Sequence, residues 1–221
     1  MKNHFFTSKM KMADIVAANH NLILVLPRFG IKLGFGEQSL QEVCDRNGLP
    51  ADFVLMVFNV YTFEDYLPDD KALKSMNLTL LIPYLQSSHH YYLNERLPHI
   101  KRHLETVANH AGDRYGTILK QFFADYEKEV QSHFECEEQE VFGKNHSDAN
   151  AHFADNHSDL VDKLSDLTQI VYKYIPGDSV TEELHELVFG IMQLSSDLEK
   201  HALLEEKILL PYCAQLERRD L

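Results

Sequence analysis

Two segments of the chain repeat one pattern of metal-binding side chains. His133 precedes Glu137 by four residues, and a second glutamate follows directly. His201 precedes Glu205 in the same way. Residues four apart share one face of a helix, so each segment offers an imidazole beside a carboxylate. One such pair is often only a surface ion pair, but two matching copies favour a metal site in which the carboxylates can bridge ions.

Histidines in two further segments are candidates to complete such a site. His89 and His90 are adjacent in one predicted helix, and His157 leads a helical stripe of leucines in another. A lone histidine on an apolar face is usually a hydrogen-bonded core residue. However, four helices with one inward histidine each would supply four imidazoles, which with two carboxylates are enough for two bridged metal ions. A packed core without metal is the alternative.

The donor types also discriminate between metals. The chain has no H-E-x-x-H motif of the zinc proteases, and Cys44, Cys136 and Cys213 lie too far apart in sequence for a thiolate zinc site. The one Glu-x-x-His match, Glu182 to His185, is interpreted as a solvated first turn of a helix. Histidine-rich, carboxylate-bridged iron remains, with manganese or mixed occupancy still open.

Four long helices must position these donors. Strand signals are nearly absent, and Gly112, Gly143 and Pro176-Gly177 divide the second part of the chain. The connections are short, which favours antiparallel neighbours. The sequence therefore predicts an all-α fold, an up-down four-helix bundle, with helices over residues 78–110, 114–142, 147–175 and 180–217.

The first part of the chain differs from the bundle. We expect a small helical domain with a linker over residues 1–72 and the bundle over 73–221. Ser39 and Glu42 form a predicted capping box. Residues 39–61 have a helix–turn–helix cadence, but the apolar run Phe53–Phe58 lacks the basic side chains of a recognition helix. This run is expected to be buried in the core or against a second copy in a homodimer.

Composition and charge argue against several classes of protein, among them nucleic-acid-binding and membrane-spanning proteins. The chain has 221 residues and a formal net charge of −13, which argues against binding nucleic acid. No apolar run approaches the roughly 18 residues of a membrane span, and the N-terminus lacks the apolar region of a signal peptide. The odd, scattered cysteines favour a reducing, cytoplasmic location. Tyr91, Tyr126, Tyr172 and Phe189 are expected to fill the core.

The histidines and their context resemble those of a known family. The marks are His90 seven residues before Leu97-Pro98, the two His–Glu pairs, and the histidine before the leucine-rich helix. At these residues the chain resembles the hemerythrin-like family of HHE cation-binding proteins. Its two-part layout is similar to that of the di-iron proteins that repair iron–sulfur clusters.

The resemblance implies a dinuclear, non-haem iron centre with an oxo or hydroxo bridge. Glu137 and Glu205 would bridge the two irons. His110 matches a further histidine of the repair proteins and is an auxiliary candidate, and His89 competes with His90. The implied ligands are His90, His133, Glu137, His157, His201 and Glu205.

The resemblance also implies a role in nitrosative or oxidative stress. O₂ or NO would be the small ligand, and apo iron–sulfur proteins would be partners in cluster repair. The alternative is a module that binds or senses O₂ or NO reversibly, without repair. Gly34-Phe35-Gly36 stands where the repair proteins commonly carry a Cys-Cys pair before a glycine, which shifts weight toward the alternative. No catalytic residue is assigned.

Overall fold

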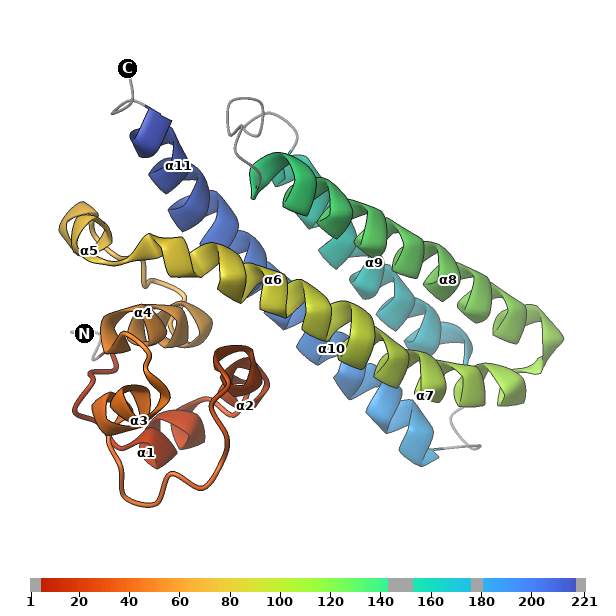
Figure 1. Ribbon diagram of the computed structural model, residues 1–221. Helices are drawn as coiled ribbons and strands as arrows, with labels where there is room; N and C mark the ends of the chain where they lie inside the picture. Colours follow the sequence, from red (N-terminus) through yellow and green to blue (C-terminus); the bar gives the residue numbers. More distant parts are fainter. Residues whose placement is uncertain (1–4, 143–152, 176–180, 218–221) are drawn as a thin grey trace. The chain divides into compact units, whose positions relative to one another are not determined.

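The computed structural model describes residues 5–142, 153–175 and 181–217, and it confirms the all-α prediction (Figure 1). Within these ranges the chain forms helices and no strand, apart from one isolated bridge between Lys11 and Ser39. Two compact units divide the chain. One comprises Met1–Ser87 with Leu203–Leu221, and the other comprises Ser88–Ala202. The domain boundary expected between residues 72 and 73 stays a prediction.

The first unit is built around one strongly apolar helix. Nine of the twelve residues of α4 are buried, including most of the run Phe53–Phe58, which confirms the buried interpretation of that run. The ring of Phe29 stacks on that of Tyr84 with centroids 4.8 Å apart. The elements of this unit are α1 (Met12–Ala18), α2 (Leu22–Val25), η1 (Leu26–Phe29), α3 (Leu40–Asn47), α4 (Ala51–Thr62), α5 (Asp70–Ser75), η2 (Leu78–Leu80), the first part of α6 (Leu81–Tyr91), η6 (Glu205–Leu209) and α11 (Leu210–Glu217).

Helix α3 begins at the predicted capping box. The Ser39 hydroxyl accepts from the Glu42 backbone N–H at 3.3 Å, and the Glu42 carboxylate accepts from the Ser39 backbone N–H at 2.8 Å. These bonds satisfy backbone donors that a helix start leaves without intrahelical acceptors. The helix ends at Gly48, whose φ of 67° is a left-handed value that glycine adopts readily.

The second unit is the helical bundle. Its elements are the end of α6, η3 (Tyr92–Arg96), α7 (Leu97–His110), α8 (Gly112–Cys136), η4 (Glu137–Val141), α9 (Phe153–Tyr174) and most of α10 (Thr181–Leu204). Helix α8 packs against both α7 and α9 (Figure 1). One apolar core takes residues from all four predicted helical stretches, among them Ile100, Phe123, Leu164 and Ile191. The bundle prediction is therefore confirmed.

Among the described residues, three helical runs contain a π-helical turn, at η3, η4 and η6. Proline follows two of these turns closely, as Pro98 after η3 and Pro211 after η6. A proline has no N–H and its ring clashes with the carbonyl four residues earlier. A widened turn before the proline accommodates both defects, so the run continues through it as helix.

The aromatic predictions are confirmed only in part. Tyr126 is buried and Tyr91 partly buried. Tyr172 and Phe189, in contrast, are 58% and 61% exposed, so their assignment to the core is wrong. Phe189 lies two residues from both Leu187 and Ile191, which are buried, and a two-residue step turns a helical side chain to the opposite side. No helix among the described residues combines the length and apolar character needed to cross a membrane.

The turn between α7 and α8 depends on two glycines. Gly112 has a φ of 76°, which a side chain would disfavour. One turn later, a Cβ built on Gly116 would lie 2.2 Å from the carbonyl oxygen of Ala108 in α7. Since that atom belongs to the backbone of a neighbouring helix, it cannot move aside cheaply, and the close approach of α7 and α8 requires glycine at 116.

We expect Gly116→Ala to lower the free energy of unfolding by about 2 kcal/mol or more, because the methyl group overpacks a backbone contact. Gly190→Ala is the matched control, since its Cβ would meet only side-chain atoms, of Ile100 at 3.2 Å and of Arg96 at 3.9 Å. Both changes gain the same helix propensity of about 1 kcal/mol. Urea unfolding followed by circular dichroism measures the two losses. Equal stabilities of the two variants would contradict the packing argument.

Candidate metal centre

Five metal-binding side chains of the second unit converge inside the bundle. They come from four different helical runs, and each is buried or nearly so. They are His89 of α6, His133 of α8, Glu137 at the start of η4, His157 of α9 and His201 of α10. Burying this many polar groups is costly unless each has a partner.

The carboxylate of Glu137 lies at the centre of these side chains. Its Oε1 lies 2.8 Å from Nε2 of His133 and 2.9 Å from Nε2 of His157. Its Oε2 lies 3.3 Å from Nε2 of His89. Nε2 of His89 in turn lies 3.0 Å from Nε2 of His201. One oxygen of the carboxylate thus faces two imidazoles and the other oxygen faces a third, an arrangement that suits a bridging ligand.

Glu137 carries a negative charge in this environment. Burial by itself would raise the pKa of its carboxyl. The imidazoles of His133, His157 and His89 close to its two oxygens outweigh burial and hold the pKa of Glu137 well below its usual range. The bundle therefore encloses an anionic oxygen donor among nitrogen donors.

Two imidazoles face each other through Nε2, and Nε2 of a third lacks hydrogen-bond geometry. Between Nε2 of His89 and Nε2 of His201 only one proton fits, since two N–H groups would face each other. Nε2 of His133 is buried and close to Glu137, yet without hydrogen-bond geometry. The Nε2 atoms of four imidazoles thus lie close to one carboxylate or to each other. A metal cation among them would accept their lone pairs and balance the negative charge. The residues present therefore fit a metal centre.

The ring of His89 is held on its outer side as well. It stacks on the ring of Phe134 with centroids 4.0 Å apart, and also on that of Phe142 at 5.5 Å. Its Nδ1 lies 2.9 Å from Oε1 of Glu138. A carboxylate that accepts from the far nitrogen of a metal-binding histidine fixes the ring and its tautomer. The second glutamate of the repeated pattern thus orients a donor on another helix.

Comparison with known families decides what kind of bundle this is. The profile of the hemerythrin HHE cation-binding domain matches residues 82–216, which is more than half of the chain. The chain belongs to the hemerythrin HHE family. All of the converging side chains fall within the matched range. No curated protein matches the chain.

Within this hemerythrin domain the structure brings His89, and not His90, to the cluster. His89 is 1% exposed, whereas His90 is exposed and its Nδ1 lies 3.1 Å from the side-chain nitrogen of Asn94. The seven-residue spacing from His90 to Leu97-Pro98 assumes two ordinary helical turns. The π turn at η3 inserts one residue into that interval. The inward position accordingly moves one residue back, to His89.

The two other predicted residues to place are Glu205 and His110. Glu205 is fully buried, begins the π turn η6 and follows His201 by four residues in an unbroken helical run. It belongs to the C-terminal segment of the first unit, so its role as a ligand stays a prediction. His110 is exposed at the end of α7, with its Nδ1 2.9 Å from the carbonyl oxygen of Thr106. The structure does not bring His110 to the cluster.

A buried pair beside His201 escaped the sequence reasoning. The hydroxyl of Tyr92 donates to Asp197 at 2.7 Å, and the Tyr92 ring meets that of His201 edge to face, with centroids 5.6 Å apart. Asp197 precedes His201 by four residues, a spacing that places both on one face of α10. This four-residue spacing could have identified Asp197 as a neighbour of His201 from the sequence.

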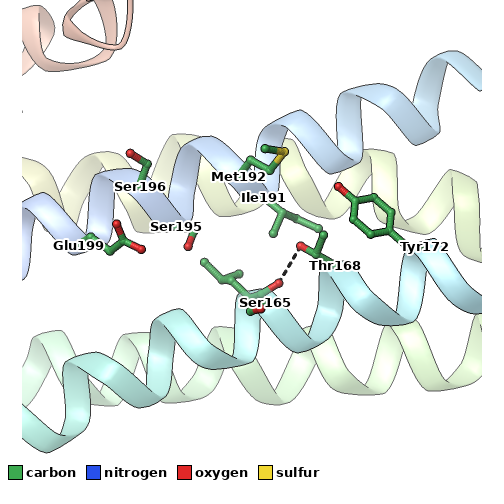
Figure 2. A pocket seen from close by; sticks show the side chains of 9 residues that line it. Ser165, Thr168, Tyr172, Ile191, Met192, Ser195, Ser196 and Glu199 are labelled. Atoms are coloured by element: carbon green, nitrogen blue, oxygen red, sulfur yellow. Dashed lines mark hydrogen bonds between the residues drawn. The ribbon is translucent and has the colours of Figure 1, made fainter. Parts of the chain in front are cut away.

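A separate surface groove of about 290 Å³ lies between α9 and α10 (Figure 2). It is lined by Leu164, Ser165, Thr168, Tyr172, Ile191, Met192, Ser195, Ser196 and Glu199. The hydroxyl of Thr168 is already used, because it donates to the carbonyl of Leu164 at 2.8 Å. None of the lining residues belongs to the histidine–glutamate cluster, so the groove is not the metal centre of the hemerythrin domain.

We expect Glu138→Ala to weaken iron binding by roughly 10–100-fold, because the ring of His89 loses the group that orients it. Glu135→Ala is the matched control, since Glu135 is also exposed on the same helical run but bonds only to Gln131 in this structure. Anaerobic titration with ferrous iron against a chelator of known affinity measures the change. The orienting role is wrong if both variants bind iron as tightly as the unmodified protein.

Proposed function

We propose that this hemerythrin-family chain is a non-haem di-iron protein that binds a diatomic ligand, O₂ or NO, reversibly. The two-sided contact of the Glu137 carboxylate carries the proposal. His133 and His157 lie at one oxygen, and His89 lies at the other. A bridging carboxylate between two sets of imidazoles supports two ions rather than one.

The proposed ligand set differs from that expected from the sequence in one residue. His133, His157 and one oxygen of Glu137 would hold the first iron. His89, His201 and the other oxygen of Glu137 would hold the second. Glu205 is the predicted second bridge. Two divalent ions exceed the charge of two carboxylates, so an anionic oxygen bridge between the ions is favoured, as the resemblance implied.

The iron pair would supply an open coordination position and a change of oxidation state. The protein's own residues do the rest. Tyr92 and Phe134 place aromatic rings against His89 or His201, which keeps bulk water from the nitrogen donors. Glu138 holds the Nδ1 proton of His89, so the Nε2 lone pair stays directed inward.

Two observations support reversible binding over cluster repair. Gly34-Phe35-Gly36 occupies the place of the repair proteins' paired thiols, and the Phe35 side chain there is buried. Cys44 is fully buried, and desolvation, with a smaller effect of Asp45, raises the pKa of its thiol to about 11. At neutral pH this thiol is protonated and shielded, so it is a poor nucleophile. Repair, in stress response, is the alternative function.

Iron content tests the proposed centre. We expect about two irons per chain after iron-replete expression, with near-ultraviolet charge-transfer bands in the oxidised protein. His89→Ala should lose most of the iron, because Nε2 of His89 lies in the cluster, while His90→Ala should retain it. The neighbouring variant is the control for folding and expression. Metal-free protein of unchanged stability, or loss of iron only in His90→Ala, would overturn the centre.

A second experiment separates binding from repair. The iron-loaded protein is incubated anaerobically with an apo iron–sulfur enzyme, and in parallel is exposed to NO and then purged. We expect the optical spectrum to change with NO and to return on purging, with no recovery of enzyme activity. Recovery of the enzyme at the expense of bound iron would instead establish repair.

A further inference from the structure

A second group of donors lies on α7 and α10, away from the dinuclear cluster. His99 and His103 are one turn apart on α7, and Glu186 of α10 lies beside them. The two rings have centroids 4.8 Å apart, and one donor atom from each of the three side chains lies within 4.8 Å of the others. Both histidines are partly exposed and Glu186 is exposed, so solvent reaches the group.

Both histidines already turn a ring nitrogen toward one cation. Nη2 of Arg102 lies 3.2 Å from Nδ1 of His99 and 3.4 Å from Nε2 of His103. A guanidinium only donates hydrogen bonds, so each of these ring nitrogens accepts with its lone pair. Both imidazoles thus direct a lone pair at the same positive group. A bound metal ion requires lone pairs directed at it in the same way.

We propose that His99, His103 and Glu186 form a mononuclear site for a borderline divalent cation of the Zn²⁺ type. Two imidazoles and one carboxylate are a common zinc ligand set that leaves a fourth position for water or another ligand. His99 follows His89 by ten residues, about 15 Å along the helix axis. The site therefore shares no ligand with the dinuclear centre and does not rest on the proposed function.

The charges around the site bear on how tightly an ion binds. A neutral imidazole is the form that binds metal. Arg102 competes directly, because its guanidinium faces the same ring nitrogens. An incoming ion must displace this exposed, flexible side chain, so removing Arg102 should strengthen binding.

An ion held in this way would join α7 to α10. It would bind the folded bundle more tightly than the unfolded chain, in which Glu186 is far from the two histidines. Such an ion raises the melting temperature as its concentration rises above its dissociation constant. Stability is thus a readout that is independent of any activity of the iron centre.

The test is zinc titration of the full chain after the dinuclear centre has been filled with iron. Equilibrium dialysis should find one further zinc per chain, and zinc should raise the melting temperature. His103→Ala should lose this zinc and the temperature shift, while iron content stays unchanged. Arg102→Ala should bind zinc more tightly. His110→Ala is the control, an exposed histidine on the same helix outside the group.

Glu186→Gln provides a second variant at an exposed position, where folding is not at risk. It should weaken zinc binding by roughly tenfold or more, because a charged ligand is lost. The proposal is overturned if His103→Ala binds zinc with the stoichiometry and affinity of the unmodified chain. It is also overturned if the additional zinc disappears in His89→Ala instead, since that zinc would then belong to the dinuclear centre.

Discussion

The bundle depends on one buried negative charge. A carboxylate placed among apolar core residues is unstable unless cations or hydrogen-bond donors surround it, and Glu137 has imidazoles at both of its oxygens. Because these imidazoles come from different helical runs, satisfying Glu137 also fixes the order and register of the helices around it. The core of leucines and aromatic residues provides the bulk of the burial, but it would tolerate small shifts that the carboxylate does not.

Helical periodicity was sufficient to predict the fold. The four stretches from 78, 114, 147 and 180 correspond to helical runs where the structure describes them, because the apolar residues recur with a helical period and strand signals are weak. Gly143, Pro176-Gly177 and the predicted starts at 147 and 180 lie outside the described residues. The buried interpretation of Phe53–Phe58 and the capping box at Ser39 also followed from local sequence. Tyr172 and Phe189 were misplaced because aromatic type was weighed above position, and each lies on the outward side of its helix.

Most of the side chains that the structure brings together are ones that the sequence singled out. The repeated His–Glu spacing identified His133, Glu137 and His201 without any structure, since i to i+4 geometry needs only an ordinary helix. The histidine of the first helix was harder to predict. Whether His89 or His90 faces inward depends on the π turn at η3, and no simple sequence pattern indicates such a turn. Glu138 is a related case: its partner, His89, lies 49 residues away, so its contact depends on tertiary packing.

The π turn at η3 also has a consequence for the adjacent histidines His89 and His90. If this turn became an ordinary helical turn with no residue removed, the preceding segment would rotate by about 100° relative to Leu97. His90 would then face inward and His89 would turn toward solvent. The neighbouring pair therefore keeps an imidazole at this donor position whether the turn is π-helical or ordinary, so that a local change of helical pitch does not remove the donor.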